Sequence, residues 1–367
     1  MAALWRVFPL LLLFVFTNCD GSVSPSSTTE GQDTEVAGNP DAGATSDTVE
    51  SDIAAQNPDT QVDTSPRSFD FPDKPTPGPT CPTQSEVNPI EEFEEATINN
   101  TRVRWVGEDT GTGVLFLFHG TAGDVTTWFD RVAGPVIIED ALKRGLVVVV
   151  IESLDRSDGA QWIVNGPPSQ NADIANVKDI MAQLEENGAY GADSPRFAVG
   201  GSNGGAFTSH IAQEVTFSGA VLFISRGAAF LHEQATVPPI VVFIPGLKDT
   251  QVPASDIPAS LEAVEGHGGV AHQWNNQPTP LTPDVLSRLP GISCPQSYTL
   301  TKSLQESGVL DSNWMIQEEP TLSLLAPLGA MFEDSKRVIL DQLLESYGGH
   351  MVTSEYNAQW LDLFLND

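Results

Sequence analysis

Short apolar runs recur along the chain from about residue 89 onward, and stretches with helical spacing separate them. This alternation is typical of a mainly parallel β-sheet that helices cover on both faces. We therefore predict an α/β fold. Its strands are expected at residues 102–106, 114–118, 146–151, 197–199, 219–224, 240–244 and 270–274.

Two longer stretches between these runs differ in character. Residues 172–186 place Ile174, Val177, Met181 and Leu184 on one side of a helix, which makes this the clearest helix of the pattern. Residues 275–346 instead contain short helix-like pieces with no strong strand between them. Because this segment is too long for an ordinary connection, we expect a helical insertion that forms a lid or a binding loop, or that is merely decorative.

The N-terminus carries Arg6 followed by an apolar run over residues 7–16. Such a run is about half of the ~20 residues needed to span a bilayer, so residues 1–19 are expected to be a signal peptide. The sequence F-T-N-C that ends at Cys19 resembles a bacterial lipobox, although Phe16 and Asn18 replace the usual residues. We expect an exported chain held by a lipid on Cys19 at the cell envelope; a free cysteine in a discarded leader is the alternative.

Residues 20–88 are rich in Ser, Thr, Asp, Pro and Gly and poor in large apolar residues. This composition buries too little surface to offset the entropy of ordering, so we predict a disordered acidic tether that joins the leader to a folded α/β domain at residues 89–367. The formal charge of −32 argues against nucleic acid, anionic membranes or polyanionic substrates as partners. A membrane is therefore expected only through the lipid anchor.

The run F-A-V-G-G-S-N-G-G-A-F ends a predicted strand and begins a predicted helix. It fits G-x-S-x-G, in which a sharp turn exposes a serine hydroxyl and neighbouring glycines prevent collisions between strand and helix. A structural or phosphate-binding turn is the alternative. The strand before the motif and the helix after it favour Ser202 as a nucleophile.

A nucleophilic serine needs a histidine base and an acid that orients it, in the chain order serine, acid, histidine. Asp249 follows the predicted strand at residues 240–244, where a carboxylate lies at the carboxyl edge of the sheet. His350 stands in S-Y-G-G-H-M-V, and glycines before a histidine allow its loop to approach the serine. We expect Asp249 and His350 to be the partners, with His272 as the second choice of base and a surface histidine as the alternative for His350.

The other histidines fit the role of base less well. His119, His210 and His232 precede the acid in the chain, and His267 stands with His272 near the last predicted strand. The stretch L-F-L-F-H-G-T-A-G-D resembles the loop that supplies an oxyanion donor, so the backbone N–H groups of Thr121 and Asn203 are the expected donors. His119 is then expected to anchor this loop.

Together these residues resemble the α/β-hydrolase superfamily, and more narrowly its secreted feruloyl-esterase and polyhydroxyalkanoate-depolymerase branch. The similarity lies in D-I-A-N-V-K-D-I-M-A-Q-L, D-S-P-R-F-A-V-G-G-S-N-G-G-A-F, the H-G-T loop, Asp249 before Val252-Pro253, and Gly349-His350. It implies hydrolysis of a small or polymer-borne carboxylic ester by a Ser–His–Asp relay that needs neither a metal nor an organic cofactor. Residues 275–346 depart from the short family connection between acid and histidine.

Several further residues have two interpretations. Trp128 and Trp162, in loops near the motifs, are candidate walls of a substrate pocket or simply packing residues. Cys81 and Cys294 are the cysteines that remain after the leader, and export favours a disulfide between them over two free thiols.

Two other functional classes remain open at the level of sequence. A prolyl-oligopeptidase-type peptidase uses the same three residues but usually carries a large N-terminal domain. A surface lipoprotein can also retain the scaffold for binding alone, although here serine, acid, histidine and both donor loops all survive in order.

Overall fold

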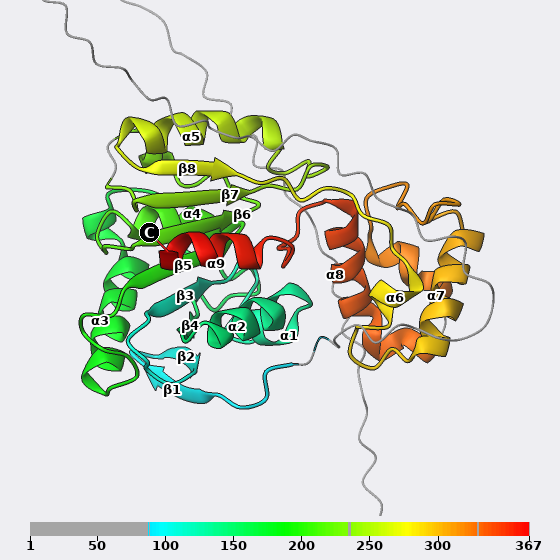
Figure 1. Ribbon diagram of the computed structural model, residues 1–367, viewed down its shortest axis with the longest axis horizontal. Helices are drawn as coiled ribbons and strands as arrows, with labels where there is room; N and C mark the ends of the chain where they lie inside the picture. Colours follow the sequence, from blue (N-terminus) through cyan, green and yellow to red (C-terminus); the bar gives the residue numbers. More distant parts are fainter. Residues whose placement is uncertain (1–86, 88, 234–235, 329, 367) are drawn as a thin grey trace, which may run out of the picture. The chain divides into compact units, whose positions relative to one another are not determined.

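The computed structural model describes residues 87, 89–233, 236–328 and 330–366. Its strands form one sheet in the order β1-β2-β4-β3-β5-β6-β7-β8 (Figure 1). The pairs β1–β2 and β2–β4 are antiparallel, and every other neighbouring pair, β3–β4 included, is parallel. This is the strand arrangement of the α/β-hydrolase fold, and the predicted fold class is confirmed. The strands are β1 (Glu94–Ile98), β2 (Thr101–Val106), β3 (Val114–Phe118), β4 (Val147–Ile151), β5 (Arg196–Gly201), β6 (Gly219–Phe223), β7 (Ile240–Ile244) and β8 (Val270–Gln273).

Each predicted strand lies within a few residues of an observed one, and β1 is the strand that the pattern missed. Its sequence, Glu-Glu-Ala-Thr-Ile, is largely exposed at one edge of the sheet. An edge strand with acidic residues has little apolar signal, and such charges protect an open edge from pairing with other chains. The central strands carry a strong signal because they are buried on both faces.

Helices cover both faces of the sheet. In β3, Leu115 and Leu117 pack in the core beneath α2 (Ala133–Lys143) and α9 (Asn357–Asn366), whereas Phe116 and Phe118 pack toward α3 (Ala172–Glu186) and α4 (Asn203–Ile211). The remaining elements of this region are α1 (Thr127–Asp130), α5 (Ile257–Gly266), η1 (Pro168–Gln170), η2 (Ala229–His232) and η3 (Ala254–Asp256). The bounds of α3 are those predicted from its apolar face.

The segment between β8 and the last helix forms a helical insertion with a core of its own. Figure 1 shows its helices grouped together. Leu286, Leu300, Leu304 and Leu343 are buried in this core, and Val132 beside α2 joins it. The elements are α6 (Pro283–Leu286), α7 (Cys294–Glu306), η4 (Leu322–Leu328), η5 (Ala330–Ser335) and α8 (Lys336–Tyr347).

The described residues include one position that the composition assigned to the tether. Val87, assigned to the tether, is buried in the core of the insertion, and its N–H donates to the Arg288 carbonyl. The predicted signal peptide and the rest of the tether lie outside the described residues. No helix of the described part is both long and apolar enough to cross a membrane.

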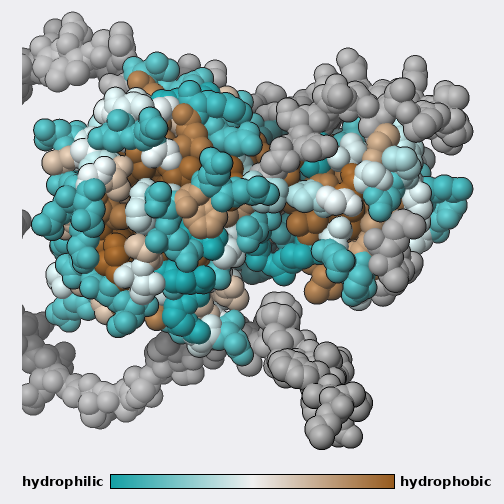
Figure 2. Space-filling view, turned by 90° about the horizontal axis from the view of Figure 1, so that it is seen from below, coloured by the Kyte–Doolittle hydropathy of each residue, from teal (hydrophilic) through white to brown (hydrophobic). Residues whose placement is uncertain are grey.

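Hydrophilic side chains predominate on the face shown in Figure 2, with hydrophobic areas between them.

Candidate active site

Ser202 occupies the sharp turn between β5 and α4. Its backbone angles are φ 54° and ψ −118°, a conformation that is strained for a residue with a side chain. Its N–H donates to the Phe223 carbonyl, and its carbonyl accepts from the Ala206 N–H. The turn is therefore held by the neighbouring strand on one side and by the first turn of α4 on the other.

The glycines around Ser202 are required by the close approach of backbone segments. A Cβ on Gly200 would lie 2.1 Å from the Gly204 carbonyl oxygen, and a Cβ on Gly204 would lie 2.3 Å from the Phe118 carbonyl oxygen. No side chain fits at such distances. The glycine pattern that singled out Ser202 thus reflects the packing of α4 against β5 and β3.

The structure brings Ser202, His350 and Asp249 together in one hydrogen-bonded line. Ser202 Oγ lies 2.8 Å from His350 Nε2, and His350 Nδ1 lies 2.7 Å from Asp249 Oδ2. The side chain of His350 is 15% exposed and that of Asp249 is fully buried. With Asp249 ionised, Nδ1 carries the ring proton and Nε2 is free to accept from the serine hydroxyl.

The carboxylate of Asp249 is fixed by the turn that follows β7. Its Oδ1 accepts from the N–H groups of Gln251 at 2.8 Å and Val252 at 3.1 Å. The other oxygen is left for His350. The short side chain of an aspartate makes this turn with its own backbone, which holds the acid at the carboxyl edge of the sheet.

The loop of His350 packs directly against the loop of the acid. Gly348 ends α8 with φ 72°, and its carbonyl accepts from the Lys248 N–H at 2.8 Å. A Cβ on Gly246 would lie 2.2 Å from the Gly349 carbonyl oxygen. The glycines before His350 therefore permit a left-handed helix end and a close contact between the two loops.

Glu345, in the last turn of α8, braces the same loop from the other side and was missed by sequence reasoning. Its Oε1 accepts from Thr353 Oγ1 at 3.0 Å and from the Ser354 N–H at 3.2 Å. Burial raises the pKa of this carboxyl, while the bonds from Thr353 and Ser354 act in the opposite direction. A glutamate near the end of a helix gives no sequence signal for this role.

His119 anchors the loop after β3, as expected. Its ring is buried, Nε2 accepts from the Ser153 N–H at 3.1 Å, and Nδ1 donates to the Gly120 carbonyl at 2.7 Å. Burial lowers the pKa of His119 from 6.5 to about 4, so the ring is neutral at neutral pH. Because both nitrogens bind backbone groups, His119 has no lone pair to offer a serine.

The other histidines are placed elsewhere in the fold. His272 lies on β8 opposite Val242 and packs beside the ring of Trp274, and His267 ends α5 at an exposed position. His210 is buried in α4 without a hydrogen-bond partner, and burial lowers its pKa. The histidine that lies beside Ser202 is His350, which was the first choice of base in the sequence analysis.

The loop of Thr121 passes beside the serine. A Cβ on Gly120 would lie 3.5 Å from the Cβ of Ser202. Within the described residues, no backbone acceptor is bonded to the N–H of Thr121 or to that of Asn203. The Asn203 N–H belongs to the first turn of α4, where backbone N–H groups lack intrahelical partners. Both N–H groups are thus left without a backbone acceptor near the turn of Ser202.

The predicted pocket role of the two tryptophans is wrong. Trp128 is 3% exposed and lies in the core beneath α2, and Trp162 is 2% exposed and stacks on Phe207 with ring centroids 4.2 Å apart. Side chains this deeply buried offer no surface to a substrate. The alternative of simple packing is correct, because aromatic rings close the core where loops leave the sheet.

Arg156 is a second residue that the sequence did not reveal. Its Nη2 donates to the Gly123 carbonyl at 3.1 Å and its Nη1 to the Ser153 carbonyl at 3.3 Å. It also lies 3.7 Å from Glu152, whose carboxylate is nearly buried. A lone arginine in a polar loop is usually solvated, so nothing in the sequence marked it as a support of the loop after β3.

Cys294, at the start of α7, is disulfide-bonded. Its predicted partner Cys81 and the predicted lipid site Cys19 lie outside the described residues. Among the residues with a described placement, no group of three or more His, Cys, Asp or Glu side chains could hold a metal ion.

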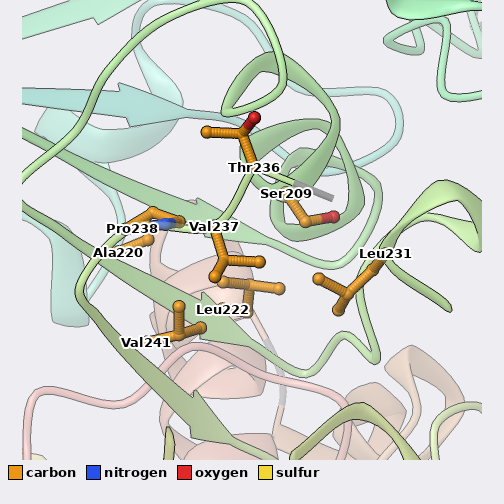
Figure 3. Close-up of a pocket in the computed structure, with 8 residues that line it drawn as sticks. All are labelled: Ser209, Ala220, Leu222, Leu231, Thr236, Val237, Pro238 and Val241. Atoms are coloured by element: carbon orange, nitrogen blue, oxygen red, sulfur yellow. The ribbon is translucent and has the colours of Figure 1, made fainter. Parts of the chain in front are cut away.

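A small apolar cavity lies between α4 and strands β6 and β7 (Figure 3). Its volume is about 10 Å³, which is at most the space of one water molecule. None of its lining residues belongs to the line of Ser202, His350 and Asp249. They are Ser209, Ala220, Leu222, Leu231, Thr236, Val237, Pro238 and Val241.

No protein-family model matches the chain, and no curated protein is significantly similar to it. Among solved structures it is similar to an arylesterase, with 11% identity, a TM-score of 0.39 and coverage of 52% of this chain and 76% of that one. It is also similar to Thermogutta terrifontis esterase 2 phosphorylated by paraoxon, with 16% identity, a TM-score of 0.37 and coverage of 51% and 82%. For YahD with malic acid the values are 16%, 0.38, 48% and 88%. Similarity at this level carries no argument about activity or substrate.

Proposed function

We propose that this protein is a serine hydrolase that cleaves carboxylic esters, with Ser202 as nucleophile, His350 as general base and Asp249 as the acid that orients His350. The observation that carries the proposal is the unbroken line from Ser202 Oγ to His350 Nε2 at 2.8 Å and from His350 Nδ1 to Asp249 Oδ2 at 2.7 Å. These distances allow direct proton transfer between serine and histidine.

In the first half of the reaction, Ser202 Oγ attacks the ester carbonyl while its proton passes to His350 Nε2. The carbonyl oxygen becomes an oxyanion that accepts from the N–H groups of Thr121 and Asn203. The bond between the acyl carbon and the alcohol oxygen then breaks, and His350 gives its proton to the departing alcohol. An acyl group remains on Ser202.

In the second half, water takes the place of the alcohol. His350 accepts a proton from water, the water oxygen bonds to the acyl carbon, and the same two N–H groups hold the second oxyanion. The bond to Ser202 breaks and the serine recovers its proton from His350. The buried carboxylate of Asp249 stabilises the imidazolium in both halves, since it lies against Nδ1 throughout.

We extend the proposal to a substrate class and a location on the basis of sequence motifs alone. The S-N-G-G turn, the H-G-T loop and Gly349-His350 resemble the feruloyl-esterase and polyhydroxyalkanoate-depolymerase branch, which favours a small or polymer-borne ester. The leader that ends at Cys19 favours an exported enzyme held at the cell envelope by a lipid.

The test is hydrolysis of short-chain and feruloyl p-nitrophenyl esters by the purified protein, beside Ser202→Ala, His350→Ala and the control His272→Ala. We expect losses of kcat/KM of about 10⁴-fold or more in the first two variants, because members of such a relay act as a unit. His272→Ala should retain wild-type rates. If wild-type protein cleaves peptides and no ester, the peptidase alternative replaces this proposal.

A further inference from the structure

The two proposed oxyanion donors are tied together by one short segment, residues 160–162, in the loop after β4. The Ala160 carbonyl accepts from the Ala122 N–H at 2.8 Å, next to Thr121. Two residues later, the Trp162 N–H donates to Asn203 Oδ1 at 2.7 Å. The segment therefore touches both loops that flank Ser202.

Asn203 contacts this segment with both ends of its side-chain amide. Besides accepting from the Trp162 N–H, it donates from Nδ2 to the Trp162 carbonyl at 3.3 Å. A side-chain amide carries one acceptor and one donor group, which match the N–H and C=O of a single residue. An alanine at this position would leave both groups of Trp162 unpaired in a partly buried place.

The 160–162 segment is itself held firmly by the core. Trp162 Nε1 donates to the His119 carbonyl at 2.9 Å, and its ring stacks on Phe207. The next residue, Ile163, donates from its N–H to the buried carboxylate of Asp173 at 2.7 Å. The segment is thus a fixed reference to which both donor loops are bonded.

The loop of Thr121 has particular need of such a support. Ala122 adopts a left-handed conformation with φ 58°, which is uncommon for a residue other than glycine, asparagine or aspartate. A strained backbone persists only where its surroundings fix it. The bond from the Ala122 N–H to Ala160 is one contact that fixes it.

We propose that Asn203 is a positioning residue. Its side chain acts through the 160–162 segment and holds the N–H groups of Asn203 and Thr121 at a constant separation around the oxyanion. This inference rests on the proposed function, in which only the backbone N–H of Asn203 has a role. It adds a role for the side chain. The side chain acts through Trp162 and Ala160 and does not touch the substrate.

The effect of removing this contact should appear in the chemical step. Both backbone donors remain in Asn203→Ala, but their spacing is no longer fixed when the oxyanion develops. Small misplacements of reacting groups reduce rates strongly, so kcat should fall by about 10- to 100-fold while KM changes by less than about threefold.

The experiment measures kcat and KM for p-nitrophenyl acetate with the whole protein, wild type beside Asn203→Ala and Asn203→Asp. Asn203→Asp keeps the size of the side chain but loses the donor to Trp162 and adds a negative charge near the oxyanion. Its kcat should fall at least as far as that of Asn203→Ala. Trp162→Phe, which loses the bond to His119 and part of the ring that stacks on Phe207, combined with Asn203→Ala should cost less than the product of the single losses, because both act on one segment.

The matched control is Asn176→Ala, which removes a buried amide on α3 whose Nδ2 donates to Thr101 Oγ1 at 2.8 Å. It should retain wild-type kcat even if it destabilises the fold. A kcat within about threefold of wild type in both Asn203 variants, or the same loss in Asn176→Ala, overturns the proposal.

A second measurement does not depend on ester cleavage. Amide hydrogen exchange at Ala122 and Trp162 should be faster in Asn203→Ala than in wild type and unchanged in Asn176→Ala. If no ester is cleaved by wild-type protein, the proposed function fails, and these exchange rates decide whether Asn203 couples the two loops. Unchanged exchange at both amides in Asn203→Ala contradicts the coupling.

Discussion

Two loops at the carboxyl edge of the sheet each carry a histidine, and they use the ring in opposite ways. In the loop after β3, His119 is buried and both ring nitrogens bind backbone groups. In the loop after α8, His350 is partly exposed and its nitrogens contact two side chains, Asp249 and Ser202. The partners of the ring, more than its place near the serine, decide whether a histidine can move a proton.

The protonation of the two rings follows from these partners. Ser153 presents an N–H to His119 Nε2, so a proton on that nitrogen would face another donor with no acceptor nearby. His350 Nε2 faces a hydroxyl that can give up its proton, and Asp249 favours the resulting positive charge. The first histidine supports a loop, and the second can serve as a base.

The largest effect that would sharpen this comparison is expected for Asp249→Asn. An asparagine amide can donate to His350 Nδ1 and so favour the tautomer that carries its proton on Nε2, which cannot accept from Ser202. We expect kcat to fall by about 10⁴-fold. The bonds from Gln251 and Val252 to Oδ1 can persist in the variant. Ester hydrolysis and urea unfolding measured together should therefore show lost activity with little lost stability.

A retained kcat of more than a tenth of wild type in Asp249→Asn would contradict the assigned role of the acid. A large loss of stability would instead mean that Asp249 mainly supports its own turn.

The second prediction concerns stability between pH 6.5 and 4, and it tests the other loop. Burial lowers the pKa of His119 to about 4, so the unfolded chain binds a proton in this range before the folded protein does. Stability is therefore lost as pH falls from 6.5 toward 4, by about 3 kcal/mol in total from this group. His119→Gln lacks this titration.

The measurement is the free energy of urea unfolding of wild type and His119→Gln at several pH values. The advantage of wild type should shrink steadily as pH falls through the window. A constant difference between the two proteins would show that His119 is not buried in its neutral form. Activity of His119→Gln on p-nitrophenyl acetate at pH 7 shows separately how much the loop of Thr121 depends on this ring.

The sequence predicted the sheet well because its central strands are buried on both faces. Runs such as Val-Val-Val-Val-Ile in β4 have no other common interpretation at this length, and β5 ends at glycines that packing requires. The exposed edge strand β1 was missed because an acidic edge has no apolar pattern. The same physical cause, two-sided burial, explains both the success and the failure.

The chain order of serine, acid and histidine indicated Ser202, Asp249 and His350 because each follows a recognisable strand end or glycine turn. The supports around them gave no such signal. Arg156, Glu345 and the side chain of Asn203 act through hydrogen bonds with backbone groups of other segments, and such bonds impose no pattern on neighbouring residues. Trp162 misled because a tryptophan in a loop can either line a pocket or fill a core.

The smallest effect is expected for Glu345→Gln, which tests how the loop of His350 is braced. Burial raises the pKa of Glu345, against the hydrogen bonds from Thr353 and Ser354 and the charge of Arg288, while Glu355 acts with burial. The folded protein therefore keeps the proton to higher pH than the unfolded chain does, and the stability due to this group is lost as pH rises through the folded pKa. Glutamine keeps an oxygen for Thr353 and Ser354 without the charge, so the variant should gain on wild type as pH rises, by about 1 kcal/mol or less. Urea unfolding across this range, with the exposed Glu318→Gln as matched control, measures the gain. If the two variants behave alike, the carboxyl of Glu345 is not buried.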